Sequence, residues 1–260
     1  MRRFLIFAIL LITFVSVFRL SRIADDWHYI VSAEPGQLIY ATSFDGDMTD
    51  WTQDEGTRLS TGVVDGAMQI TVTTSGSGIF SVIEPYMRDF DLTVTTQAID
   101  GPLDNAYGVV FRQRQVTTYA WFDLFQKQTR NDYYIFLISS DGYYQVKRVY
   151  NGEEKIISNW NRSSAIHQGI NAQNTIRVVA VKDQFRFFIN GEQVQLCIPD
   201  NPSAESTPLS NGECRGGSWQ DTLIDDLIPD GRIGVTVQVG LTQPTGVVVE
   251  FDDFVVYGAE

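Results

Sequence analysis

The sequence predicts an all-β protein, an antiparallel β-sandwich of the jelly-roll kind, preceded by one N-terminal transmembrane helix. Strand-length runs rich in Val, Ile, Phe, Tyr and Thr recur along most of the 260 residues. Pairs such as Asp65-Gly66, Asp141-Gly142 and Asn190-Gly191 separate these runs, and such pairs supply the tight turns of β-hairpins. With 43% hydrophobic residues the chain can build a large core, so we expect one sandwich domain over residues 38–260.

The N-terminal segment, residues 1–24, is predicted to be a signal-anchor helix that stays in the membrane. An uncharged apolar run from Phe4 to Phe18 lies between arginines, and Arg19 and Arg22 can snorkel and so lengthen the span. A cleaved signal peptide is the alternative, but no small-residue cleavage pattern follows the run directly. The basic N-terminus favours a cytoplasmic start, which places the remaining domain on the periplasmic or extracellular side. Residues 25–37 are interpreted as a linker or stalk.

The strands follow in order from this linker. We expect them at residues 38–44, 64–74, 79–84 and 90–99, at residues 147–150 and 155–157 around Asn151-Gly152, and at residues 175–181, 185–189, 193–197, 231–239 and 247–257. Residues 158–174 form a polar connection, and residues 221–227 are the best candidate for a short helix.

The stretch from Tyr107 to Tyr150 is the most strongly β-forming part of the chain. It is divided into two long hairpins in series, with breaks expected at Thr117-Thr118, at 129–132 and at Asp141-Gly142. Ile135 and Leu137 alternate with Phe136 and Ile138, so both faces of this sheet carry apolar side chains. One of these faces therefore needs a second sheet over it.

The charge balance excludes one class of partner. The net charge is −13, and the four arginines of residues 1–24 leave 15 basic and 32 acidic side chains, or −17, for the rest. A domain this acidic repels phosphate backbones and anionic head groups, so nucleic acid is not expected as a partner.

Seven short motifs resemble a known group of proteins when they are taken in order. They are Phe44-Asp45 with Trp51, Val64-Asp-Gly-Ala67, Asp89-Phe-Asp91, Tyr107-Gly-Val-Val-Phe-Arg112, Asn190-Gly191, Asp230-Gly-Arg-Ile-Gly234 and Phe251-Asp-Asp-Phe254. The chain resembles the concanavalin A-like lectin/glucanase superfamily over about residues 38–258, and within it the laminin-G-like and 3-keto-disaccharide-hydrolase-type domains. The resemblance implies the fold, but the superfamily includes lectins, glycosidases and adhesion modules.

Motifs for catalysis are absent from the sequence. The Glu-x-Asp-x-x-Glu string that the glucanases of the superfamily carry does not occur, and Glu153-Glu154 lies at a predicted turn. The two histidines, His28 and His167, cannot form a His-rich metal site. We therefore expect a protein that is not an enzyme, with a glycosidase of the keto-disaccharide type as a third hypothesis.

Two further sites are expected from residue types. Cys197 and Cys214 enclose a polar loop and are predicted to form a disulfide in an oxidising compartment, with free thiols as the alternative. No cofactor is expected, but Asp45 and Asp47 in the first turn and Asp252 on the last strand could hold a structural Ca²⁺. The alternative is that Asp is simply a favourable turn residue.

Aromatic residues are the candidates for a binding surface. The set is Trp51, Trp121, Tyr133, Tyr143, Tyr144, Trp160 and Trp219. Exposed rings serve both glycans and protein interfaces, and the sequence does not separate these uses. The leading hypothesis is a membrane-anchored accessory subunit that docks on a larger membrane protein complex, and the alternative is an envelope carbohydrate-binding module.

Overall fold

The computed structural model describes residues 6–7, 9–10, 12–17, 28–46, 48–120, 123–241 and 246–260, and these divide into two compact units. One unit consists of residues 1–29 and 116–130, and the other of residues 30–115 and 131–260. In the first unit, residues 6–7, 9–10 and 12–17 are helical, and the strands β8 (Ala106–Ala120) and β9 (Asp123–Ile138) pass through residues 116–130. The described part of the chain contains no helix that is both long and apolar enough to cross a membrane. The anchor predicted for residues 1–24 stays a prediction, because residues 1–5, 8, 11 and 18–24 lie outside the described residues.

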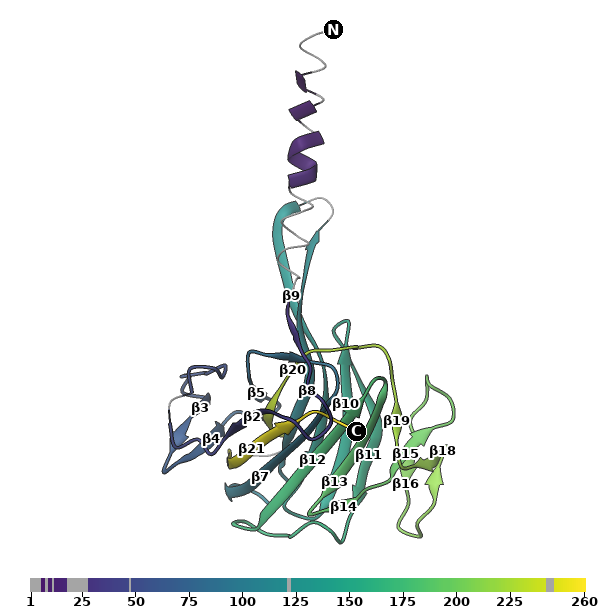
Figure 1. Cartoon of the computed structure of the whole chain (residues 1–260). Helices are drawn as coiled ribbons and strands as arrows, with labels where there is room; N and C mark the ends of the chain where they lie inside the picture. Colours follow the sequence, from purple (N-terminus) through teal and green to yellow (C-terminus); the bar gives the residue numbers. More distant parts are fainter. Residues whose placement is uncertain are drawn as a thin grey trace. The chain divides into compact units, whose positions relative to one another are not determined.

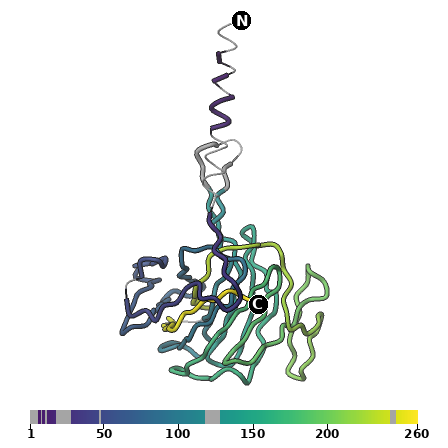
Figure 2. Tube along the Cα trace, viewed as in Figure 1, coloured from purple at the N-terminus to yellow at the C-terminus, as the bar shows by residue number. Residues whose placement is uncertain are grey.

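The second unit is a sandwich of two antiparallel sheets, as the sequence predicts (Figure 1). The nine-stranded sheet has the order β14-β13-β12-β7-β21-β4-β3, with β19 beside β13 and β2 beside β21. Its strands are β2 (Leu38–Thr42), β3 (Leu59–Val64), β4 (Ala67–Val72), β7 (Phe90–Asp100), β12 (Gln173–Val181), β13 (Gln184–Ile189), β14 (Glu192–Gln193), β19 (Leu223–Ile224) and β21 (Val247–Tyr257). In Figure 2 the last strand, in yellow, runs among blue strands from the beginning of the domain, because β21 pairs with β2, β4 and β7.

The six-stranded sheet has the order β11-β10-β9-β8-β20-β5. Besides β8 and β9 it contains β5 (Gly78–Val82), β10 (Tyr143–Tyr150), β11 (Glu153–Arg162) and β20 (Arg232–Gln238). Three small sheets complete the fold: β1 (Ile30–Val31) with β6 (Tyr86–Met87), β15 (Leu196–Pro199) with β18 (Gly217–Gln220), and β16 (Thr207–Pro208) with β17 (Cys214–Arg215). The predicted linker over residues 25–37 thus includes a strand, since Ile30 and Val31 pair with β6.

The core lies between the two large sheets and follows the alternation of their strands. Phe136 on β9 packs on Phe187 of the opposite sheet with ring centroids 4.9 Å apart, and Phe111 on β8 lies 5.4 Å from Phe185. Ile135 and Leu137, the neighbours of Phe136 along β9, belong to a separate apolar cluster on the other face of the six-stranded sheet. Both faces are therefore apolar, as the sequence predicts, and only one faces the second sheet.

Two of the predicted turns have the backbone that their residue types favour. Asn151-Gly152 joins β10 to β11 with φ of 56° and 80°, and Asn190-Gly191 joins β13 to β14 with φ of 49° and 83°. Positive φ at both central residues matches the right-handed twist of the flanking strands, and Asn and Gly tolerate it best.

Four sequence-based expectations are wrong in detail. Strands β8 and β9 run without interruption through the breaks expected at Thr117-Thr118 and at 129–132. The polar connection expected from residue 158 starts later, because β11 continues to Arg162. Residues 221–227 were expected to form a short helix, but they contain the strand β19, which pairs with β13. Asp65-Gly66 joins two strands, and the first of them, β3, was not expected.

Candidate functional site

The outer face of the six-stranded sheet, turned away from the core, carries a groove of about 460 Å³. We call it the outer-face groove and define it by side chains that line it from five of the six strands: Phe80, Tyr133, Gln145, Lys147, Glu154, Trp160, Thr236 and Gln238. They lie on one face because β-strand residues alternate, so that Gln145 and Lys147 point outward while Tyr144 and Val146 enter the core.

Aromatic rings form the apolar part of this groove. Phe80, Tyr133 and Trp160 are half-buried and pack on a buried cluster of Val82, Val110, Ile135 and Leu137. The rings of Phe80 and Tyr133 lie 5.5 Å apart and are tilted by 58°, so they make one continuous apolar surface. Because these three residues are half-buried, part of each side chain stays accessible to a ligand.

Polar groups lie beside these rings and are held in fixed orientations. The Gln145 side chain is buried and donates from Nε2 to Oδ1 of Asn159 at 3.1 Å, while Thr236 donates from Oγ1 to the carbonyl of Ile79 at 2.9 Å. Lys147 and Glu154 form an ion pair at 3.4 Å. An apolar surface with a few positioned amide, hydroxyl and charged groups is the usual composition of a small-molecule site.

The electrostatics of the groove keep its phenol protonated. Burial raises the pKa of Tyr133, and the negative charge of Glu154 raises it further. The hydroxyl of Tyr133 is therefore a hydrogen-bond donor over the physiological pH range.

The aromatic residues singled out in the sequence are divided by the fold. Tyr133 and Trp160 line the outer-face groove, and Tyr144 and Trp219 line a second cavity described below. Trp51 is buried in the core, where its ring lies 4.8 Å from that of Phe254, so it cannot face a ligand. Tyr143 is exposed outside both cavities, and the side chain of Trp121 lies outside the described residues. Phe80, Gln145 and Gln238 were missed, although their outward positions follow from the strand period of two.

The two cysteines are paired, as the sequence predicts. Cys197 and Cys214 form a disulfide with Cα atoms 5.4 Å apart, and it closes the segment that contains β15 to β17. Free thiols, the alternative, are thereby excluded.

The calcium candidates do not form a ligand cluster in the described residues. Asp45 is exposed and accepts a hydrogen bond from Ser43 at 2.8 Å, and Asp252 accepts one from the backbone N–H of Asp253 at 2.7 Å. Asp47 lies outside the described residues. Among the residues that the structure describes, no group of three or more His, Cys, Asp or Glu side chains could hold a metal ion.

Comparisons with known proteins agree with this architecture. The model of a family described as 3-keto-alpha-glucoside-1,2-lyase-like domain matches residues 40–238. Its agreement with the motif-based resemblance confirms the expected superfamily. No curated protein matches the sequence significantly.

Solved structures share the fold at low sequence identity. The carbohydrate-binding module CBM66 from Bacillus subtilis has a TM-score of 0.53 and 14% identity, over 82% of this chain and 98% of that one. A Bacillus subtilis protein of unknown function with a galectin-like fold has a TM-score of 0.55 and 11% identity, over 86% and 97%. The Crh5 transglycosylase has a TM-score of 0.50 and 11% identity, over 88% and 90%. At these identities the likeness establishes the fold alone.

Proposed function

The chain belongs to the family of 3-keto-alpha-glucoside-1,2-lyase-like domains, and we propose that it is a non-catalytic, membrane-anchored module that binds carbohydrate in its outer-face groove. The observation that carries the proposal is the row of half-buried rings, Phe80, Tyr133 and Trp160, beside oriented polar groups. A sugar presents C–H faces that pack on rings, and hydroxyls that exchange hydrogen bonds with amides. The similarity of the fold to a carbohydrate-binding module supports the same ligand class.

The acid content of the groove supports binding without hydrolysis. Hydrolysis of a glycosidic bond ordinarily uses two carboxyl groups on opposite sides of the bond. Among the described residues that line the groove, Glu154 is the one carboxylate, and it is paired with Lys147. Its side chain is 52% exposed, which is typical of a solvated ion pair at a strand end.

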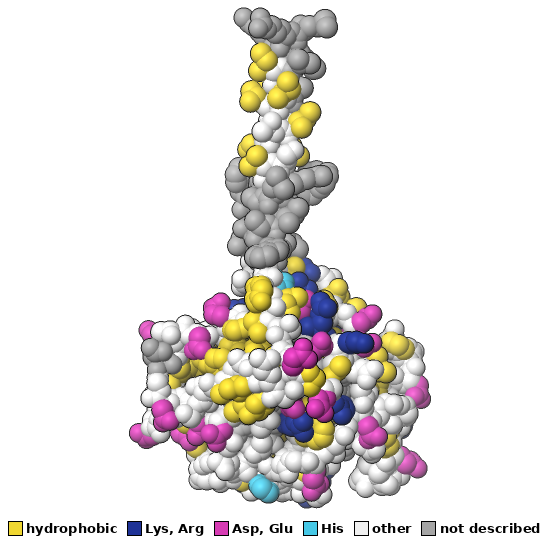
Figure 3. All heavy atoms as spheres, viewed as in Figure 1, with side chains coloured by type: hydrophobic (Ala, Val, Ile, Leu, Met, Phe, Trp, Pro, Cys, Tyr) yellow, Lys and Arg dark blue, Asp and Glu magenta, His cyan; other side chains and the backbone are white. Residues whose placement is uncertain are grey.

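Two features support a membrane-anchored location outside the cytoplasm. The disulfide between Cys197 and Cys214 is typical of oxidising compartments. The helical residues near the N-terminus expose apolar side chains, such as Phe7 at 68% and Phe14 at 64%, which suit a lipid environment. The acidic surface of the domain would keep it away from anionic head groups, and Figure 3 shows Asp and Glu side chains spread over the visible face of the sandwich.

The test is saccharide binding by the full chain, held in a detergent without a sugar head group so that no competitor is present. Affinity electrophoresis through gels containing a soluble α-glucan, β-glucan, xylan or fructan should retard the protein in at least one gel. Trp160→Ala should weaken that affinity about fivefold, because one stacked ring is worth roughly 1 kcal/mol. Tyr133→Phe, which keeps the ring, should have a smaller effect.

Tyr143→Ala is the matched control, because Tyr143 is exposed on β10 and lies outside the groove. It should migrate like the unchanged protein in every gel. If Trp160→Ala and Tyr133→Phe also migrate like the unchanged protein in a gel that retards it, the groove is rejected as the site. This conclusion requires that each variant keeps its thermal unfolding transition.

A second candidate function is catalysis on a glycosidic bond, and the family description itself favours it. Incubation with a 3-keto-disaccharide, followed by chromatography of the products, separates the two candidates. Turnover that Glu154→Gln abolishes would replace the binding proposal, whereas an intact substrate would support it.

The accessory-subunit hypothesis stays a prediction. Purification from the native source in a mild detergent tests it, since a subunit should elute with a larger complex. Elution as a lone monomer would count against a docking role and would leave the carbohydrate-binding proposal intact.

A further inference from the structure

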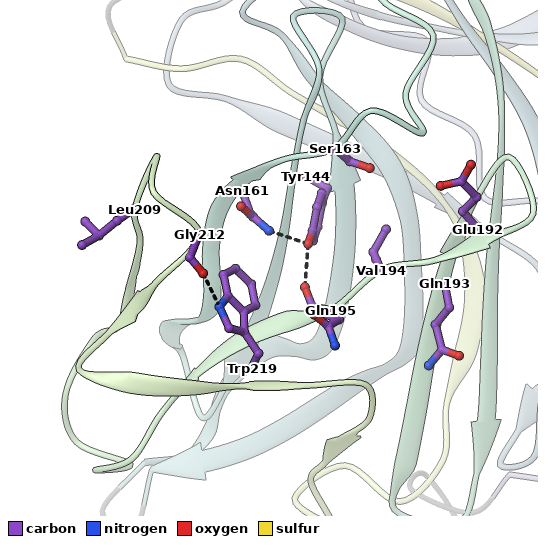
Figure 4. A pocket seen from close by; sticks show the side chains of 10 residues that line it. All are labelled: Tyr144, Asn161, Ser163, Glu192, Gln193, Val194, Gln195, Leu209, Gly212 and Trp219. Carbon is purple, nitrogen blue, oxygen red and sulfur yellow. Dashed lines mark hydrogen bonds between the residues drawn. The ribbon is translucent and has the colours of Figure 1, made fainter.

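A second cavity, of about 380 Å³, lies beside the segment that the disulfide closes (Figure 4). Its walls come from β10 and the end of β11, from β14 and its connection to β15, and from the disulfide-closed segment and β18. It shares no lining residue with the outer-face groove. The two cavities can therefore be tested separately.

One wall is an indole ring that is fixed before any ligand arrives. Trp219 is half-buried and donates from Nε1 to the carbonyl of Gly212 at 2.9 Å (Figure 4). On its strand Trp219 pairs with Cys197, whose disulfide partner Cys214 follows Gly212 by two residues. Because the disulfide and the hydrogen bond both restrain this wall, little conformational entropy is lost when the ring covers a ligand.

The opposite wall is rich in hydrogen-bond acceptors. Asn161 donates from Nδ2 to the hydroxyl of Tyr144 at 2.6 Å, and that hydroxyl donates to the carbonyl of Gln195 at 2.5 Å (Figure 4). Gln193 and Gln195 donate from their Nε2 atoms to Asp221, at 2.7 and 3.0 Å. The side-chain nitrogens are thus engaged, while the Oδ1 atom of Asn161 and the Oε1 atoms of both glutamines accept no hydrogen bond from described residues.

The charge of the lining narrows the ligand class. Glu192 is the one charged side chain among the described residues that line the cavity. A site with carboxylate and amide acceptors and no cation disfavours phosphates, sulfates and uronates. It favours a neutral molecule that brings many O–H donors and one apolar face.

We propose that this cavity is a second saccharide-binding site, in which Trp219 covers the C–H face of a neutral sugar and the oxygens of Asn161, Gln193 and Gln195 accept hydrogen bonds from its hydroxyls. Gln193 and Gln195 are exposed, so water solvates their amide oxygens, and the hydroxyls of a sugar can replace this water as hydrogen-bond donors. Two separate sites would let the domain hold one polysaccharide chain at two points or bridge two chains, which raises avidity without new contacts.

The experiment follows the tryptophans of the full chain by fluorine NMR after 5-fluorotryptophan labelling, in the same sugar-free detergent. Trp219→Phe and Trp160→Phe identify the two signals. Maltotriose, cellotriose, xylotriose and triacetylchitotriose are the probes, each titrated to millimolar concentration. We expect at least one of them to shift the Trp219 signal, with the same midpoint in the Trp160→Ala variant.

Gln193→Leu should weaken the affinity measured by the Trp219 signal about fivefold, because the variant lacks one hydrogen-bond acceptor. Gln184→Leu is the matched control, since Gln184 is also an exposed glutamine but lies on β13 outside the cavity, and it should change nothing. A Trp219 signal that no probe shifts would overturn the proposal, and so would a shift that disappears in Trp160→Ala. A Trp160 signal that stays still while Trp219 responds would instead reject the groove and keep this second site.

Discussion

Arg112 is the largest side chain that the structure buries completely, and it connects loops that are distant in the sequence. Its guanidinium donates to the backbone carbonyls of Ile228 at 2.8 Å, Arg88 at 3.1 Å and Lys182. It also lies 4.5 Å from the ring centroid of Phe185. Burial lowers the pKa of Arg112, but these oxygens and the ring stabilise its charge. Arg112, in the middle of β8, thus stabilises the core and does not face the surface.

Arg112→Met should lower the free energy of unfolding by about 3–5 kcal/mol, because it leaves buried carbonyls without their donor. Urea unfolding followed by tryptophan fluorescence measures the change. Arg162→Met, at an exposed position on β11, is the control and should cost no more than about 0.5 kcal/mol. Equal stability of the two variants would contradict the role assigned to Arg112.

Buried tyrosines predict how stability depends on alkaline pH. Burial raises the pKa of Tyr40, Tyr107, Tyr133, Tyr134 and Tyr144 above the ordinary 10.0. Above about pH 10 the unfolded chain releases these protons while the folded chain keeps them, so the folded state binds more protons. The contribution of these tyrosines to the free energy of unfolding should therefore be constant up to about pH 9. It should decrease as the pH rises further.

Urea midpoints measured between about pH 9 and pH 11.5, with tyrosinate absorbance recorded in parallel, test this expectation. The tyrosinate absorbance of these five tyrosines should appear only as the protein unfolds. A midpoint that does not move, with full tyrosinate absorbance in the folded state, would contradict it.

At the scale of elements, the groove depends on how closely its strands approach. Gly108 lies on the outer face of β8, and a Cβ atom there would lie 2.1 Å from the carbonyl oxygen of Phe136 on β9. Gly62 on β3 has no heavy atom within 4 Å of the same position. Both glycines lie within strands, but only Gly108 lies where the backbones of two strands, β8 and β9, come close together.

Gly108→Ala should destabilise the protein by about 1–3 kcal/mol, because the added methyl forces β8 and β9 apart. Gly62→Ala is the matched control and should be neutral or stabilising by about 0.5 kcal/mol, since alanine has less conformational freedom to lose. Thermal unfolding of the two variants side by side gives the comparison. A more stable Gly108→Ala would mean that the strands do not approach as described.

At the scale of the whole molecule, the sandwich is closed by its last strand. The strand β21 pairs with β2, β4 and β7, so the beginning and end of the domain share one sheet. The calcium hypothesis drew on this proximity, but Asp45 and Asp252 already have protein partners. Hydrogen bonds between β21 and its neighbours β2, β4 and β7 hold these ends together.

The unfolding temperature should be the same in EDTA as in millimolar Ca²⁺, because backbone hydrogen bonds between β21 and its neighbours close the sheet. Differential scanning calorimetry of the full chain measures it. A rise of several degrees with Ca²⁺, reversed by the chelator, would instead establish the clasp that includes Asp45, Asp47 and Asp252.

The local pattern of residues determined the fold class, most strand positions and the Asn-Gly turns, because strand period and turn backbone are set by near neighbours. The disulfide was predictable for another reason, since the chain has only two cysteines. It misplaced the breaks in β8 and β9, since polar residues such as Thr117 can lie within a long strand that pairs with its neighbour in a hairpin. It also left Phe80 unnoticed as a groove residue, although Trp160 and Tyr133 were candidates.

Only the tertiary structure decided which aromatic residues face solvent together and which, like Trp51, belong to the core. It also decided that Arg112 is buried and that Trp219 meets Asn161 across a cavity. The physical reason is that the alternation of a strand assigns side chains to two faces but does not say which face a second sheet will cover. That choice depends on contacts between strands far apart in the chain, and the proposed binding surface lies on the face that remains uncovered.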